Sequence, residues 1–94
     1  MGASEFIVSC QAKSAREAFK NLVEEAEYEN GHGGYTGTIA EKHSYKMVTP
    51  RPDESPAACI DRHMDADTFG DKWGPAGCVE GPPGTYTFFG CASD

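Results

Sequence analysis

The strongest constraint on the fold of this chain is an apolar stripe with helical spacing between residues 14 and 30. Apolar residues recur there at intervals of three and four, which places them along one side of an α-helix. Ser14 followed by Glu17 has the spacing of a capping box, and Asn30-Gly31 supplies a left-handed stop. The pattern predicts an amphipathic helix over about 14–30 that covers an apolar surface. The stripe consists of Ala15, Ala18, Phe19, Leu22, Val23 and Ala26.

Short segments rich in β-branched and aromatic residues supply the strands that this helix would cover. Segments 78–80 and 85–93 flank the turn Gly-Pro-Pro-Gly and predict a closing hairpin. Segments 35–40 and 45–49 predict either another hairpin, which we prefer, or one long strand over 35–49. In chain order the segments are 4–10, 35–40, 45–49, 78–80 and 85–93.

A second, shorter helix is expected after the proline-rich segment 50–56. Ser55 followed by Pro56 has the form of an N-cap and a first helical residue. The sequence therefore predicts a short helix over about 56–64. The segment 65–77 that follows is expected to be irregular.

These elements predict a single α+β domain over residues 1–94, because a chain of this length is too short for two independent cores. We expect a two-layer sandwich, in which an antiparallel sheet of three to four strands carries the main helix across one face. The first strand, the helix and the second strand would alternatively form a parallel β-α-β unit. The strand order is therefore left open.

The charge and composition of the chain exclude several kinds of partner. Eight Lys and Arg against fifteen Asp and Glu give a net charge of −7, which argues against direct binding to nucleic acid or anionic membranes. No apolar stretch approaches the ~20 residues that span a bilayer. Without a signal peptide the expected location is the cytoplasm, where the four cysteines are thiols. Eleven glycines and six prolines predict a loop-rich domain of modest stability, which a homo-oligomer would reinforce.

The acidic end of the main helix is the clearest electrostatic feature of the sequence. Glutamates there meet the partial negative charge of the helix dipole, so a metal ion, a neighbouring Lys or Arg, or a basic partner would relieve the repulsion. The alternative is an acidic surface that water solvates. The residues are Glu24, Glu25, Glu27 and Glu29.

A glycine-rich segment follows the main helix and is the main candidate for a ligand-binding site. Residues 30–40, NGHGGYTGTIA, place four glycines around His32. Glycines permit close approach of a ligand to the backbone, and their N–H groups can bind an anion. The segment is neither a P-loop nor a dinucleotide fingerprint, because its glycines follow a helix and no Gly-Lys-Ser/Thr is present. The candidate site comprises His32, Gly33, Gly34, Tyr35 and Thr36, with Lys72 and Trp73.

The tryptophan in this candidate site has two interpretations. Trp73 would either pack over the sheet as a core anchor or lie exposed and stack on a planar ligand. In the second case Lys72 and Arg62 would meet a phosphate. A nucleotide-like ligand would join the aromatic residues and the glycine-rich segment in one site.

Catalytic and metal-binding constellations are not recognisable in the sequence. The three histidines and Cys59 match no zinc-ligand spacing, although Cys59 and His63 would share a face of the second helix. Cys59, Cys78 or Cys91 with a histidine base would make a thiol nucleophile, but the spacing pairs none of them. We therefore assign no catalytic residue, no metal ligand and no cofactor.

Three segments carry a resemblance to a group of known proteins. They are GHGGYTGTIAEK (31–42), KWGPAGC (72–78) and YTFFGCAS (86–93). In these segments the chain resembles small uncharacterised proteins of bacteriophages and prokaryotic mobile elements. The resemblance implies a viral accessory protein in the host cytoplasm and brings no activity or catalytic residue with it.

The sequence as a whole predicts a small acidic, non-enzymatic binding protein. The resemblance implies a phage accessory or counter-defence protein. Its partner is expected to be a host protein or a small anionic, nucleotide-like ligand, bound through the glycine-rich segment. The alternative function is a small metal- or thiol-dependent enzyme that uses histidine and cysteine residues.

Overall fold

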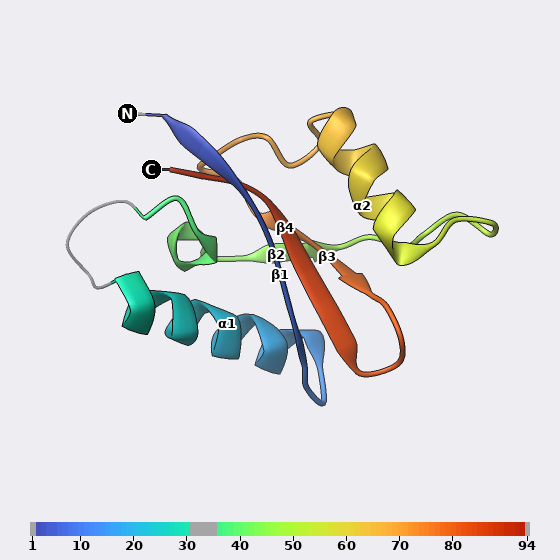
Figure 1. The fold of residues 1–94 in the computed structure, drawn as a ribbon, viewed down its shortest axis with the longest axis horizontal. Coiled ribbons are helices and arrows are strands. Elements are labelled where there is room, and N and C mark those ends of the chain that lie inside the picture. Colours follow the sequence, from blue (N-terminus) through green and yellow to red (C-terminus); the bar gives the residue numbers. More distant parts are fainter. Residues whose placement is uncertain (1, 31–35, 94) are drawn as a thin grey trace.

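The computed structural model describes residues 2–30 and 36–93, which form a mixed sheet with an α-helix on each face (Figure 1). Strands and helices follow one another along the chain in an order that ends with two consecutive strands. In that order they are β1 (Ala3–Gln11), α1 (Ala15–Asn30), the 3-10 helix η1 (Ile39–Glu41), β2 (Tyr45–Met47), α2 (Pro56–Asp65), β3 (Ala76–Glu80) and β4 (Thr85–Ser93).

The sheet has the strand order β1-β4-β3-β2. β4 is central and antiparallel to both neighbours, with Ala3 opposite Ser93 at one end of β1 and Gln11 opposite Thr85 at the other. β2 pairs with β3 in parallel. Because α2 connects these two strands, β2, α2 and β3 form a β-α-β crossover.

Local capping signals set the beginnings of both α-helices. The Ser14 hydroxyl accepts a hydrogen bond from the Glu17 N–H at 3.2 Å. The Ser55 hydroxyl accepts one from the Ala58 N–H at 3.1 Å, with Pro56 in the first turn. Each serine satisfies an N–H group that has no partner inside its helix. These contacts confirm the two N-caps that the sequence predicts.

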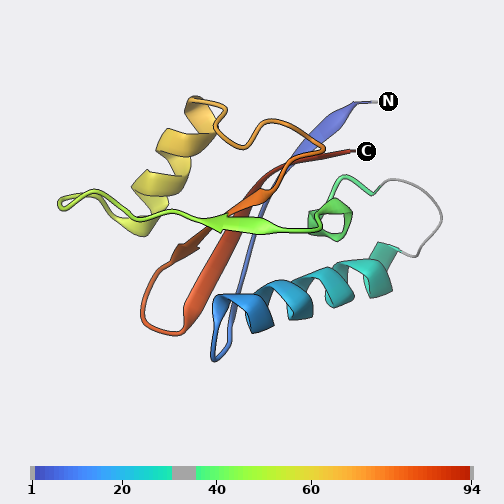
Figure 2. The same cartoon turned by 180° about the vertical axis from the view of Figure 1, so that it is seen from behind.

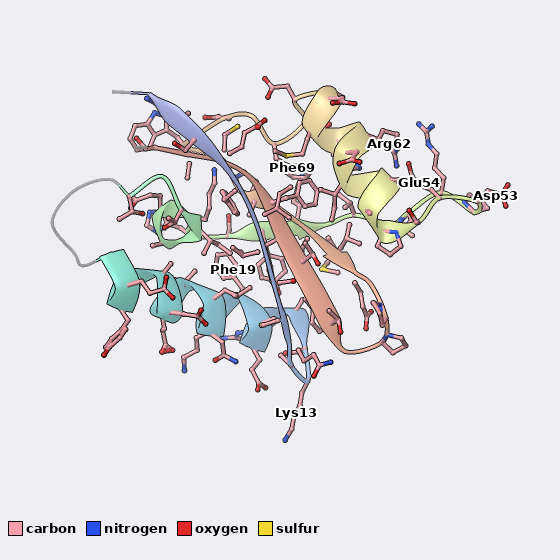
Figure 3. All side chains as sticks on the ribbon, viewed as in Figure 1. Lys13, Phe19, Asp53, Glu54, Arg62 and Phe69 are labelled. Carbon is pink, nitrogen blue, oxygen red and sulfur yellow. The ribbon has the colours of Figure 1, made fainter. Side chains whose placement is uncertain are left out.

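The helices α1 and α2 cover opposite faces of the sheet (Figure 2), and a hydrophobic cluster lies under each of them. Successive strand residues point to opposite faces, so Phe88 packs in the α1 cluster and Phe89 in the α2 cluster. Phe19 and Phe69 belong to these two separate cores (Figure 3). The domain therefore has three layers, with the sheet in the middle.

The α+β class, the four strands, the main helix and the short helix are confirmed, while two details differ from the expected architecture. The sheet is mixed rather than wholly antiparallel, because the α2 crossover returns the chain parallel to β2. The short helix covers the face opposite α1, which adds a third layer to the expected two. The β-α-β unit contains α2 and not the first strand and α1.

The predicted strand over 35–40 is wrong for its described part. Residues 39–41 form η1, and β2 covers only 45–47 of the predicted 45–49, so neither the second hairpin nor the long strand exists there. Thr38 caps the 3-10 turn, since its side chain accepts from the Ala40 N–H, and Gly37 has a φ of 70°. These local hydrogen bonds and the left-handed glycine turn the chain away from an extended path.

An ion pair ties the proline-rich connection to α2. The Glu54 carboxylate accepts from Arg62 Nε at 2.8 Å and from Arg62 Nη2 at 2.9 Å, and the two side chains face each other in Figure 3. These hydrogen bonds, with a further one from the Arg51 backbone N–H, lower the pKa of Glu54 to about 2. Two parallel bonds of this kind fix both side chains in one geometry.

The Glu54 ion pair should make stability depend on acidity. Because its pKa falls from about 4.3 in the unfolded chain to about 2 in the folded one, the contribution is present above pH ~4.5 and disappears toward pH ~2. Glu54→Gln should therefore lower the free energy of unfolding at neutral pH and converge with the wild type at low pH. Urea unfolding across this range would measure it, with Asp53→Asn as the neighbouring exposed control. A difference that stays constant with pH would contradict the assignment.

Candidate functional site

Trp73 lies at the tip of a tight turn formed by residues 71–74. The Gly74 N–H donates to the Asp71 carbonyl at 3.0 Å, and the Trp73 N–H donates to Asp71 Oδ1 at 2.9 Å. The carboxylate and the backbone of Asp71 therefore fix the turn from both sides. The Trp73 side chain remains 65% exposed. It is not the core anchor that one interpretation of the sequence offered.

The buried side chain of Lys42 stabilises this turn by hydrogen bonds. Lys42 is only 2% exposed, and its ammonium group donates to the carbonyls of the turn. An ammonium has three donors, and all of them are used here. Burial lowers the pKa of Lys42, against opposing contributions from Cys91 and Asp71. The acceptors are the carbonyls of Asp71 at 3.2 Å, Lys72 at 3.3 Å and Gly74 at 2.9 Å.

The Lys72 ammonium lies over the indole ring of Trp73. Its Nζ lies 5.4 Å from the centroid of the Trp73 ring, within the range of a cation–π interaction. The same Nζ donates to the Gly2 carbonyl at 3.4 Å. Lys72 therefore links the turn to the start of β1 and places a positive charge beside the exposed ring.

Thr36, the other described member of the predicted site, has an internal role. Its N–H and hydroxyl both donate to Glu41 Oε2, at 3.1 and 2.9 Å. Its hydroxyl also lies 2.7 Å from the Thr38 hydroxyl. These bonds connect Thr36 to Glu41, the last residue of η1, so Thr36 helps to fix the conformation of the segment that carries Lys42.

The start of β1 and the end of β4 lie at the same end of the sheet (Figure 1), and hydrogen bonds join the segments next to Thr36 and Trp73 to this end. The Gly37 N–H donates to the Ser93 carbonyl at 2.8 Å, and Ser93 is opposite Ala3. The neighbouring Gly2 carbonyl is the acceptor of Lys72. The other predicted site residues, His32, Gly33, Gly34 and Tyr35, lie outside the described residues.

A shallow hollow of about 250 Å³ lies beside the turn. It is smaller than the ~300–1,000 Å³ usual for small-molecule sites. Phe69, one of its lining residues, belongs to the α2 cluster. The lining residues are Lys46, Thr68, Phe69, Asp71, Gly74 and Pro75.

The cysteines lack the properties of a catalytic thiol. Burial is the main cause that raises the pKa of Cys10, Cys59, Cys78 and Cys91, and it raises the pKa of Cys78 to about 12. A nucleophilic cysteine requires the opposite, a lowered pKa in a partly exposed setting.

His63, which the sequence places on the same face of α2 as Cys59, packs against aromatic residues of the core. His63 packs against two neighbouring aromatic rings, with centroid distances of 5.8 Å to Phe69 and 6.1 Å to Phe89. Burial, with the nearby Arg62 charge, lowers the pKa of His63. Among residues 2–30 and 36–93, no three His, Cys, Asp or Glu side chains gather as a metal site would require.

Sequence reasoning missed Lys42, on which the geometry of the site depends. Its neighbours in sequence, Glu41 and His43, suggest an ordinary solvated charge rather than a buried one. Its acceptors lie 29, 30 and 32 residues away along the chain. No local signal could have identified it.

Comparison with protein-family profiles, curated proteins and solved structures finds no match to this chain. In the described part of the chain, no helix is both long enough and apolar enough to cross a bilayer.

Proposed function

We propose that this chain is a non-enzymatic binding protein that inserts Trp73 into a pocket on a protein partner. The observation that carries the proposal is a 65% exposed tryptophan on a turn that a buried lysine braces from beneath. Tryptophan is enriched among the residues that dominate the binding energy of protein interfaces. A rigid turn reduces the entropy lost when the ring is buried by a partner.

The shape and charge of the surface favour a protein over a small anionic ligand. The ring projects from the tip of a turn, and the hollow beside it is small for a nucleotide-sized ligand. Lys72 and the exposed Asp71 flank Trp73 with opposite charges, which suits a polar rim around an apolar pocket. The net charge of −7 favours a neutral or basic partner. In the phage setting suggested by the sequence resemblance, the partner would be a host protein.

Replacing Trp73 with alanine should weaken partner binding without unfolding the domain. Because the ring is mostly exposed, we expect a stability change within about 0.5 kcal/mol. Loss of a buried anchor in the complex should weaken binding at least about tenfold. The measurement is affinity capture from a host lysate, followed by titration of the purified captured protein by calorimetry.

Tyr28→Ala is the matched control for this experiment, since Tyr28 is an aromatic residue 91% exposed on α1. Binding should survive it. Trp73 is the single tryptophan of the chain, so its fluorescence reports directly on the site. A saturable emission shift on titration with a panel of mononucleotides and cyclic dinucleotides would favour the small-ligand alternative. Equal capture by wild type and Trp73→Ala would reject the proposal.

A further inference from the structure

The outer edge of β1 is a long, open row of backbone hydrogen-bonding groups. β1 runs for nine residues, Ala3–Gln11, at the end of the sheet order, and no described segment pairs with its outer side. The opposite edge strand, β2, has three residues and includes the exposed Lys46. Short length and lysine are common devices that prevent edge pairing. The two edges of this sheet therefore differ in their readiness to accept another strand.

The hydrogen-bond pattern shows which residues of β1 point outward. The Ala12 N–H donates to the Gly84 carbonyl at 3.0 Å, so position 12 bonds inward, and the alternation of an antiparallel ladder makes the even-numbered residues do the same. Cys91, opposite Glu5, turns its N–H away from β1 to the Phe69 carbonyl at 3.1 Å. The outward N–H and C=O groups thus belong to Ala3, Glu5, Ile7, Ser9 and Gln11.

The side chains of these same residues leave the edge unprotected. The strand sequence ASEFIVSCQ contains no proline, no glycine and no lysine, and Glu5 is its one charge. At its centre Ile7 is 56% exposed. A β-branched residue with an exposed side chain and an outward backbone is well suited to pairing with another strand.

We infer that β1 pairs with β1 of a second copy of this chain, antiparallel about a two-fold axis at Ile7. The two sheets then join into one, and Ile7 lies opposite Ile7 of the second copy. Ala3 faces Gln11, and Glu5 faces Ser9, across the new junction. All outward-pointing residues of the strand are paired in this register, each pair exchanging two backbone hydrogen bonds.

Charge and length select this register over its neighbours. A register shifted by two residues leaves end residues unpaired. A register with its two-fold axis at Glu5 brings two carboxylates face to face, which is destabilising. With Ile7 at the centre, the two Glu5 residues are separated by four positions, about 13 Å along the strand. That distance exceeds the Debye length of about 8 Å at physiological ionic strength.

The dimer goes beyond the proposed function and does not depend on it. The Trp73 turn lies at the end of the sheet, and the junction runs along the outer side of β1, so each copy would carry its own contact surface. Two such surfaces on one particle would increase the avidity for a partner that presents two pockets. Failure of dimerisation would leave the Trp73 proposal intact.

Sedimentation equilibrium of the full chain tests the dimer. The weight-average mass of the wild type should rise with concentration from 10.1 kDa toward twice that value. Ile7→Lys places two lysines face to face at the centre of the junction and should raise the dimer dissociation constant at least about tenfold. Met47→Lys is the matched control, because Met47 is 51% exposed on the other edge strand, and it should dimerise as the wild type does.

Residue-resolved amide exchange tests the register. In the dimer, the amides of Glu5, Ile7 and Ser9 should become protected as concentration rises, whereas those of Phe6 and Val8 are protected throughout by β4. A protein that stays monomeric up to millimolar concentration would overturn the inference. So would a dimer that Ile7→Lys leaves unchanged, a dimer lost in Met47→Lys, or protection that does not alternate along β1.

Discussion

Replacing Lys42 with methionine should destabilise the domain by about 2–4 kcal/mol, since a buried charged donor satisfies several acceptors at once. Methionine fills a similar volume, so the loss is that of the hydrogen bonds and not of packing. The carbonyls of Asp71, Lys72 and Gly74 lose their described side-chain donor. At roughly 4–8 °C per kcal/mol for a domain of this size, the melting temperature should fall by roughly 8–30 °C. Urea and thermal unfolding followed by circular dichroism would measure both quantities.

Lys46→Met provides the control for the loss of a lysine near the same turn. Lys46 is exposed on β2 and lines the hollow beside the turn, and its replacement should change stability by no more than about 0.5 kcal/mol. The fluorescence anisotropy of Trp73 supplies a second readout. It should fall in Lys42→Met, because a turn without its brace moves faster, and stay unchanged in Lys46→Met. Equal stability losses in the two variants would show that the Lys42 hydrogen bonds do not stabilise the turn.

The Lys42 brace also connects stability to the proposed function. A mobile turn must be ordered when the partner binds, which costs affinity even though Trp73 itself is unchanged. Lys42→Met should therefore weaken partner binding under conditions where the domain remains folded. A variant that loses stability but binds with wild-type affinity would separate the brace from the function.

The elements that the sequence predicted well are those specified by residues close together in the chain. The apolar stripe and the Ser14–Glu17 spacing lie within the helix they define, and Ser55-Pro56 starts α2 directly. The closing hairpin follows from the turn between β3 and β4, where the Gly81 N–H donates to the Thr85 carbonyl at 2.9 Å. In each case the decisive contact spans no more than a few residues.

The features that the sequence could not predict depend on distant contacts or on competition among local ones. Residues 39–41 belong to a segment of β-forming composition, but the Thr36 and Thr38 side chains supply hydrogen bonds that favour a 3-10 turn. The parallel pairing of β2 with β3 depends on how α2 packs against the sheet.

In the candidate site, too, the sequence predicted some features and left others open. Lys72 and Trp73 were predicted from residue type, and the structure places them side by side at the surface. Whether Trp73 would be exposed was left open by the sequence, because only the fold determines which side of the turn faces solvent. The role of Trp73 as a partner contact remains a prediction for the capture experiment.

Gly77→Ala should cost about 1–3 kcal/mol, the range for adding a methyl group to a well-packed core. A Cβ atom at Gly77 would lie 2.5 Å from Phe89 Cζ and 2.8 Å from Phe69 Cε2. These rings pack edge to face against each other, with centroids 5.4 Å apart and planes at 87°. Neither ring can retreat easily, because both belong to the cluster between α2 and the sheet. Thermal unfolding would record the loss as a lower melting temperature.

Gly81→Ala separates this steric effect from the general consequences of replacing a glycine. A Cβ at Gly81 would meet nothing closer than Pro56 Cγ at 4.0 Å, so stability should change little or rise slightly. Phe69→Leu in the Gly77→Ala background tests the mechanism directly. Removing part of the ring that meets the new methyl group should make the double variant more stable than the sum of the two single losses predicts. Strict additivity would mean that the clash at Phe69 does not cause the destabilisation, and would shift the cause to Phe89.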